Sequence, residues 1–432
     1  MRRALCLIFT LMVFFLVGEN GWAQKNYARR LVNELCSPEY HGRGYVKKGD
    51  FKAAQFIASQ FDSLGLEPVV GESYFQEFEI PVNTFPDTLG LSLNGLVLRP
   101  GHHFLVEPWS GSGKGSFEAV AIQKSDFVNE ASFMARLRQA KGKFLVYSEQ
   151  DMDSLEQSYR DKLKKGLKDL GMSSNPFVAG VLKITTKKLT WGGSGVASSI
   201  PYFTVKSDRK PTEVKKVSVA VRNKHFEHYK TRNVIGRVKG TSGLGKTLLI
   251  GAHYDHLGRM GSSAYFPGAN DNASGTAMLL SLAKYYAENP HDYDVVFVAF
   301  GAEEQGLYGS RHFVENPPVD LEKISFMLNL DINGTGDDGI TVVNGAVHDR
   351  LFGKLESINK EKSYLPEVKS RGEACNSDHC FFHFKGVKSF YVYTRGGSKA
   401  YHDVFDTADN LSLSGFDGTY GLLRDFLNSL TR

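Results

Sequence analysis

The sequence lacks an excess of charge of either sign. Its 52 Lys and Arg residues are spread among 47 Asp and Glu residues, and the formal net charge of +5 is small for a chain of 432 residues. A basic surface of the kind that binds nucleic acid is therefore not indicated, and we expect no nucleic-acid partner. Internal repeats and long low-complexity tracts are absent too, and the apolar (41%) and charged (23%) fractions are those of an ordinary globular protein.

Long hydrophobic runs are absent after the N-terminus, so we expect no stable membrane insertion of the mature chain. At the N-terminus two arginines precede an apolar run over residues 4–17, which is shorter than the roughly 20 residues needed to span a bilayer. Small residues follow at Gly21 and Ala23, as at a signal-peptidase site. Residues 1–23 are therefore predicted to be a signal peptide, with a membrane anchor as the alternative. The mature protein is expected to be exported, to the periplasm or the extracellular space.

Cysteine is scarce, because only 4 cysteines are present and one of them lies in the predicted signal peptide. Export permits disulfides, and Cys375 and Cys380 are close enough in sequence to pair. We expect these two residues to form a disulfide and Cys36 to be free and buried. A thiol nucleophile at Cys375, near His379, is an alternative that this disulfide would exclude.

Two motifs of hydrolases are missing, and two motifs of nucleotide-binding proteins occur in the wrong context. Neither G-x-S-x-G nor H-E-x-x-H is present. Residues 240–247 fit G-x-x-x-x-G-K-T, but a strand-like run follows where a helix is needed, so we interpret them as a hairpin turn after a strand at 233–239. Residues 334–339 fit G-x-G-x-x-G but lead into a strand at 340–343, so we interpret them as a polar turn. We expect no nucleotide binding.

The pattern of apolar residues divides the chain into three parts after the signal peptide. The first, 24–84, contains predicted helices at 27–37 and 48–64. The second, 85–230, alternates short β-like runs with turns and holds a charged helix at about 153–169. We interpret this second part as an inserted β-rich domain.

The third part, 231–432, repeats a strand, a loop and a helix. Nearly continuous apolar runs predict strands that are buried on both faces, at 247–252, 294–301, 324–330 and 389–394, with helices between them at 275–288 and 306–315. This is an α/β pattern. We expect a three-layer αβα fold, in which helices cover both faces of a mostly parallel mixed central sheet.

Residues that can bind a metal ion follow these predicted strands or precede the helix at 275–288. In open α/β sheets, ligands bind beyond the carboxyl ends of the strands, so such residues can converge although they are far apart in sequence. Unpaired, they would be costly to bury, and cations offset that cost. Imidazole and carboxylate ligands are typical of zinc, with manganese or cobalt less expected. The residues are His253, Asp271, Glu303, Glu304, Asp331 and His402.

This set contains enough ligands for two metal ions. Each ion could take one histidine and one carboxylate, with a further carboxylate bridging, and such a pair of ions can activate water and stabilise the developing oxyanion. One carboxylate must stay free of metal as a general base. Glu303 and Glu304 suit these two roles. If the end of the strand is extended, the side chains of adjacent residues point to opposite sides, so one can bind metal while the other faces the substrate.

The same segments resemble peptidase family M28 in order and spacing. The resemblance rests on His253-x-Asp255, the Gly-Ala-Asn-Asp-Asn-x-Ser-Gly segment at 268–275, Phe300 with the Glu-Glu-x-Gly-Leu-x-Gly-Ser segment at 303–310, Leu-Asn-Leu-Asp at 328–331, Ser377-Asp378-His379, and Tyr401-His402 with 406–409. The inserted part, particularly 141–207, resembles a protease-associated domain more weakly.

The resemblance implies a fold of the zinc-dependent exopeptidase type and a role for each residue. His253 and Asp331 would bind one zinc ion, Glu304 and His402 the other, and Asp271 would bridge them. Glu303 would be the general base, and Asp255 would orient His253. Asp378 would help to shape the substrate pocket, and the peptide bond after Asp271 is expected to be cis.

The implied activity is hydrolysis of peptide or protein substrates by a secreted enzyme with two zinc ions, most simply an aminopeptidase that removes N-terminal residues. The alternatives are a carboxypeptidase of the same family, a glutaminyl cyclase that uses one zinc ion, and a binding or adhesion module. The complete ligand set argues against a relative without activity. Metal stoichiometry, and the end at which a peptide shortens, distinguish these possibilities.

Overall fold

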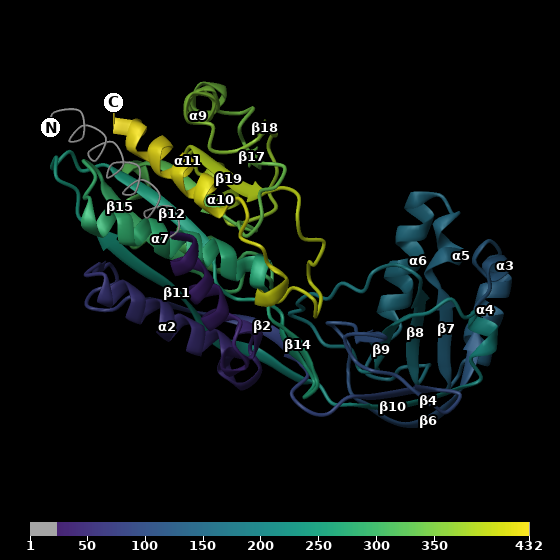
Figure 1. Cartoon of the computed structure of the whole chain (residues 1–432). Coiled ribbons are helices and arrows are strands. Elements are labelled where there is room, and N and C mark those ends of the chain that lie inside the picture. Colours follow the sequence, from purple (N-terminus) through teal and green to yellow (C-terminus); the bar gives the residue numbers. More distant parts are fainter. Residues whose placement is uncertain (1–23, 432) are drawn as a thin grey trace, which may run out of the picture.

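A computed structural model describes residues 24–431, and the predicted signal peptide therefore lies outside the described residues. Two bodies are present, each built on its own sheet (Figure 1). The chain leaves the larger body after β2 (Phe75–Thr84) and returns through β11 (Lys224–Val238), which pairs antiparallel with β2. Thr84 lies opposite Lys224, so both ends of the smaller body start from one place. No helix over residues 24–431 has the length and apolar character needed to cross a membrane.

The larger body contains a nine-stranded mixed sheet in the order β1-β11-β15-β12-β16-β19-β17-β18, with β2 against β11. Its centre, β15-β12-β16-β19, is parallel, as predicted from the four apolar runs. The strands on either side of this centre join it in antiparallel fashion. The remaining bounds are β1 (Glu67–Pro68), β12 (Thr247–His253), β15 (Asp294–Phe300), β16 (Ile324–Leu330), β17 (Ile340–Val343), β18 (Val368–Ser370) and β19 (Ser389–Thr394).

Helices cover both faces of this sheet, which gives the three layers expected from the sequence. Leu248 and Ile250 of β12 pack on one side, and Leu249 between them packs on the other, because successive strand residues face opposite ways. The first face is covered by the helix at 24–35, α2 (Gly49–Ser63), α7 (Ser274–Glu288), α9 (Asp349–Lys362) and α11 (Phe416–Asn428). The second face is covered by α8 (Tyr308–Glu315) and α10 (His379–Phe384).

The smaller body holds an eight-stranded sheet in the order β4-β3-β10-β6-β7-β8-β9-β5, of which β6 to β9 are parallel. The charged helix predicted at about 153–169 is present as α6 (Gln157–Asp169), and a separate short helix, α5 (Glu149–Asp153), precedes it. The strands are β3 (Gly90–Leu93), β4 (Leu96–Val97), β5 (Phe104–Val106), β6 (Gly113–Ala121), β7 (Phe144–Ser148), β8 (Gly180–Thr185), β9 (Tyr202–Lys206) and β10 (Lys216–Val221). The helices are α3 (Lys124–Phe127), α4 (Glu130–Gln139), α5 (Glu149–Asp153) and α6 (Gln157–Asp169).

The two motif look-alikes lie in loops. A strand, β12, follows Lys246 as expected, and the turn at 334–339 leads into β17. The hairpin predicted around 240–247 is wrong, however, because β15 lies between β11 and β12 and pairs with both. The connection therefore passes over the end of β15, and the Lys246 ammonium lies 5.5 Å from the centre of the Tyr293 ring.

Short elements complete the larger body around the site. β13 (Gly258–Met260) and β14 (Ala264–Phe266) form a small antiparallel ribbon, and a π-helical turn, η4 (Ala269–Ala273), leads into α7. The 3-10 helices of the larger body are η1 (Pro38–Arg43), η2 (Val46–Lys48), η5 (Leu321–Lys323), η6 (Ala408–Asn410) and η7 (Ser429–Thr431), and η3 (Pro211–Glu213) lies in the smaller body.

Candidate metal centre

The parallel strands at the centre of the large sheet end at one edge, and the site residues lie there. His253 is the last residue of β12, Asp331 follows β16 directly, and Glu303 and Glu304 lie in the turn after β15. They line a pocket of about 350 Å³, to which the loops after β16 and β19 and the segment before α10 also contribute. Its walls are His253, Asp271, Glu303, Glu304, Gly306, Leu307, Asp331, Ile332, Cys375, Asn376, Tyr391, Tyr401 and His402.

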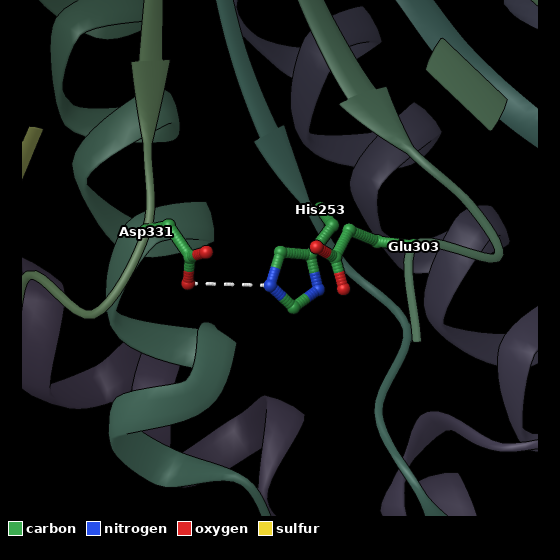
Figure 2. Close-up of side chains that lie close together, drawn as sticks. All are labelled: His253, Glu303 and Asp331. Carbon is green, nitrogen blue, oxygen red and sulfur yellow. Dashed lines mark hydrogen bonds and ion pairs between the residues drawn. The ribbon is translucent and has the colours of Figure 1, made fainter. Parts of the chain in front are cut away.

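One group of possible ligands is His253, Glu303 and Asp331, whose ligand atoms lie within 4.8 Å of one another. Figure 2 shows Asp331 and Glu303 on opposite sides of the imidazole. The Nε2 atom of His253 lies 3.3 Å from Oδ1 of Asp331. His253 is 1% exposed, so this imidazole faces two carboxylates almost entirely away from solvent.

Asp271 lies between two imidazoles. Its Oδ1 atom is 3.4 Å from Nε2 of His253, and its Oδ2 atom is 3.0 Å from Nε2 of His402. His402 also lies 3.2 Å from Oε2 of Glu304. The two oxygens of one carboxylate thus face two different histidines, each of which has a second carboxylate beside it.

These separations fit the coordination of zinc. Zinc binds imidazole nitrogen and carboxylate oxygen at about 2.0–2.2 Å in a tetrahedron, whose ligand atoms are then about 3.3–3.6 Å apart. The contacts of His253 with Asp271 and Asp331, 3.4 and 3.3 Å, match such an edge. The contacts of His402, 3.0 and 3.2 Å, are slightly shorter. The donor set and its spacing therefore suit two ions that share Asp271.

The backbone around Asp271 is held by Asp406. The two carboxylate oxygens of Asp406 accept the N–H groups of Asn270 (2.9 Å) and Asp271 (3.0 Å). The Asp271–Asn272 peptide bond is cis, as expected from the family resemblance. Burial raises the pKa of Asp406 to about 6, although these N–H groups favour its ionised form.

Asp255 lies close to His253 and also bonds to the turn that carries Glu303 and Glu304. Its Oδ1 atom is 3.9 Å from Nδ1 of His253, while its backbone carbonyl is nearer, at 3.2 Å. Its carboxylate accepts the N–H of Glu303 (3.0 Å), the N–H of Glu304 (3.4 Å) and the hydroxyl of Tyr45 (3.2 Å). Asp255 therefore ties the turn with the two glutamates to the end of β12. Burial raises its pKa to about 7.

Glu303 and Glu304 face different partners, but not because they continue a strand. The residue before them, Ala302, has φ 58°, so the chain turns as β15 ends. Burial raises the pKa of Glu303 well above its usual value, and the nearby charges of Asp378 and Glu304 add to this shift. Burial would also raise the pKa of Glu304, but the imidazoles of His402 and His256 hold it at about 2. The two neighbours thus differ in their preferred charge.

His256 is a part of the centre that the sequence reasoning missed. It is fully buried, and its Nδ1 donates to Oε1 of Glu304 at 2.6 Å. The other oxygen of Glu304, Oε2, faces His402. Its Nε2 has no hydrogen-bond partner among the described residues. A group of possible ligands is formed by His256, Asp271 and Glu304. The available signal was a second histidine three residues after His253, in the loop that follows the same strand.

Arg43 was also missed, because nothing in its local sequence marks it. Its guanidinium is fully buried and donates only to backbone carbonyls: Tyr254 (2.7 Å), Leu35 (3.1 Å), Pro267 (2.7 Å) and Gly268 (2.7 Å). Two of these carbonyls belong to the segment that leads to Asp271, and a third is next to Asp255. The N-terminal part of the chain therefore fixes two loops of the metal centre.

The predicted disulfide between Cys375 and Cys380 is present, and Cys36 is free and buried. The thiol nucleophile considered for Cys375 is thereby excluded. Cys375 lies on the pocket wall. Within the disulfide loop, the hydroxyl of Ser377 donates to Oδ2 of Asp331 at 3.1 Å.

Asp378, predicted to help shape the pocket, lies behind the pocket wall. It is fully buried, and the wall is formed by Cys375 and Asn376 of the same loop. Burial raises the pKa of Asp378 to about 7. Its charge also contributes to the raised pKa of Glu303. Asp378 therefore affects the site through its charge, although it does not line the pocket.

The chain is similar to known peptidases in sequence and fold. Residues 233–427 match the sequence model of peptidase family M28. The aminopeptidase YwaD of Bacillus subtilis is 28% identical over 364 residues, which are 83% of this chain and 72% of that protein. A probable lipoprotein aminopeptidase, LpqL of Mycobacterium tuberculosis, is 29% identical over 53% of this chain and 46% of its own length.

A solved structure has the same fold over nearly the whole chain. The zinc aminopeptidase BSAP of Bacillus subtilis superimposes with a TM-score of 0.69 at 22% identity, covering 94% of this chain and 95% of that one. The family match spans the segment that carries every candidate ligand. Residues 233–427 therefore carry the sequence pattern of peptidase family M28, and the comparisons support a zinc metallopeptidase.

Proposed function

We propose that the protein is an exported aminopeptidase that uses two zinc ions to remove residues from the N-terminus of peptides. The observation that carries this proposal is the position of Asp271, whose two oxygens lie 3.4 and 3.0 Å from the imidazoles of His253 and His402. A carboxylate between two imidazoles is the arrangement expected of a bridging ligand. The aminopeptidase names of the relatives support the choice of substrate end.

In this proposal the ligands divide as the family resemblance implies. His253 and Asp331 hold one ion, Glu304 and His402 hold the other, and Asp271 bridges the two. Zinc supplies Lewis acidity, which activates water and polarises the scissile carbonyl. Asp255 orients His253 and the turn that carries the glutamates, and His256 fixes the second oxygen of Glu304.

Glu303 is the proposed general base. It accepts a proton from the attacking water and passes it to the leaving amine. Its raised pKa supports this role, because a carboxylate of ordinary pKa is a weak base near neutral pH and a raised pKa strengthens it as a proton acceptor. Asp378 shapes the pocket from behind the disulfide loop.

The domain organisation and the export of the chain are part of the proposal. Residues 24–84 and 231–432 form the peptidase domain, and 85–230 form a domain inserted into it. Two separate sheets, joined through β2 and β11, support this division. Export rests on the sequence of residues 1–23.

The direct test is mass spectrometry of digests of a peptide with two free ends, beside the same peptide acetylated at its N-terminus. We expect the free peptide to shorten only from its N-terminus and the acetylated peptide to stay intact. Shortening of both peptides from the C-terminus would establish a carboxypeptidase instead. Loss of ammonia from an N-terminal glutamine, without shortening, would establish a glutaminyl cyclase.

A further inference from the structure

Residues 188–194 of the smaller body, here called the strap, cross from its own sheet to the metal centre. The strap lies between β8 and β9 and contains neither helix nor strand. Trp191 pairs with His402 through two hydrogen bonds. Its backbone N–H donates to the carbonyl of His402 at 2.8 Å, and its own carbonyl accepts Nδ1–H of the His402 imidazole at 2.9 Å.

The second of these bonds determines how His402 presents its ring. A carbonyl can only accept, so Nδ1 must carry a proton, and in the neutral ring that binds a metal ion the lone pair is then on Nε2. Nε2 is the atom that faces Asp271 and Glu304. Histidines that bind metal commonly donate their other N–H to a carbonyl or carboxylate, and this contact fixes both tautomer and ring orientation.

The loop that carries His402 is bonded to its own body near its two ends, where the N–H of Arg395 donates to the carbonyl of Gly339 (2.8 Å) and Asp406 accepts the N–H groups of Asn270 and Asp271. Between Thr394, which ends β19, and η6 the chain forms no helix or strand, and His402 itself has φ 53°. Lys188 of the strap holds this loop on both sides of His402. Its ammonium donates to the carbonyls of Lys399 (2.7 Å) and Tyr401 (3.1 Å) and pairs with the buried carboxylate of Asp403 at 2.7 Å.

The strap is itself anchored on both bodies. Trp191 is 8% exposed, its Nε1–H donates to the carbonyl of Val106 at 2.7 Å, and its ring stacks on Phe266 with centres 4.8 Å apart. Val106 belongs to the smaller sheet, and Phe266 ends β14 just before the segment of Asp271. A side chain at Gly193 would collide with Gln305, the residue after Glu304. The strap thus contacts the loop of His402, the residue after Glu304 and the strand that precedes the Asp271 segment.

We propose that the strap is a working part of the metal centre, in which Lys188 and Trp191 are positioning residues that hold His402 ready to bind zinc. The peptidase domain then lacks a complete site without the smaller body. This inference rests on the proposed function, because it takes His402 to be a zinc ligand. The competing explanation is that the strap only packs the two bodies together.

The test compares zinc binding, by competition with a chelator, in the wild type and in variants of two adjacent lysines. Lys188→Met keeps the length of the side chain and removes its three polar contacts, and Lys188→Arg restores a charged donor. Lys187→Met is the matched control, because that ammonium pairs with Glu149 (3.5 Å) and Asp153 (3.1 Å) within the smaller body. For Lys188→Met we expect one of the two ions to bind about 10–100-fold more weakly and the other to bind as in the wild type. Lys188→Arg should recover most of the affinity, and Lys187→Met should change neither ion.

A second readout is nitrogen NMR of the zinc-bound protein with labelled histidine. We expect the His402 Nδ1 proton to exchange slowly in the wild type and faster in Lys188→Met. Unchanged affinity for both ions in Lys188→Met, or an equal loss of both, would overturn the strap inference and leave the proposed function intact. If the active wild type binds a single ion, the two-zinc proposal fails. The strap inference then stands only if Lys188→Met weakens that ion.

Discussion

Both bodies of the protein contain parallel strands that end at an open edge, and only one of these edges has the residues of a metal centre. In the smaller body the carboxyl ends of β6 to β9 border a pocket of about 350 Å³ lined by residues such as Gln123, Ser148, Thr186 and Arg209. In the larger body a pocket of the same size is lined by histidines and carboxylates. Over residues 24–431, both groups with the spacing of metal ligands lie in the larger body. In both bodies a pocket lies at the carboxyl ends of parallel strands, and the side chains that line it determine what it can bind.

The largest effect on turnover should come from replacing the glutamates at the edge of the large sheet with glutamine. Glu303→Gln should keep zinc and lose turnover by at least the ~10²–10⁴-fold typical of general acid–base catalysis, because the amide cannot accept a proton. Glu304→Gln should lose zinc first and regain part of its rate in excess zinc. Both are measured as bound zinc and kcat.

Glu149→Gln is the matched control for this pair. Glu149 follows β7 directly, and its carboxylate accepts the hydroxyl of Thr185 at 2.7 Å within the smaller body. Its replacement should leave zinc content and turnover unchanged. If Glu303→Gln were the variant that loses zinc and is rescued by it, the roles of the two glutamates would be reversed.

A smaller effect is expected at His256. Removing its imidazole in His256→Ala frees one oxygen of Glu304, whose contact with Nδ1 is now 2.6 Å. We expect the affinity for one zinc ion to fall about 10–100-fold, as for other residues that orient metal ligands. Isothermal calorimetry of zinc binding measures this. His103→Ala, in the smaller body, should bind zinc like the wild type, and equal affinities in the two variants would remove His256 from the site.

The smallest effect is expected at the opposite end of β12. Lys246 precedes the first residue of that strand, whereas His253 is its last residue, so Lys246 lies far from the chemistry. Lys246→Ala should keep near-normal turnover and lose only the contact with Tyr293, worth about 0.5–1 kcal/mol. Thermal unfolding and peptidase assays check both points. Tight ATP binding that disappears in this variant would contradict our interpretation of residues 240–247.

The sequence predicts the central strands of the large sheet well, because both faces of those strands are buried and their apolar runs are nearly continuous. It does not predict which strands are neighbours. The insertion of β15 between β11 and β12 is a long-range pairing that no local pattern records, and the predicted hairpin at 240–247 failed for this reason. The extended geometry expected for Glu303 and Glu304 failed because the chain turns at Ala302.

The residues of the candidate site could be chosen from sequence because each follows a strand or precedes a helix. Their supports could not be chosen in this way. Arg43 binds carbonyls more than 200 residues away, and the carbonyl of Trp191 meets His402 across 211 positions. Backbone carbonyls carry no mark in the sequence, so partners of this kind become visible only in three dimensions.

The central claim is that two zinc ions act together at the edge of the large sheet. It is tested most directly by removing metal from the purified protein with a chelator and then adding zinc back in steps. Bound zinc and peptidase activity are measured at each step. We predict that activity disappears without metal and is fully restored only when two zinc ions are bound per chain. Full activity with a single bound ion, or activity that survives complete removal of metal, would contradict the claim.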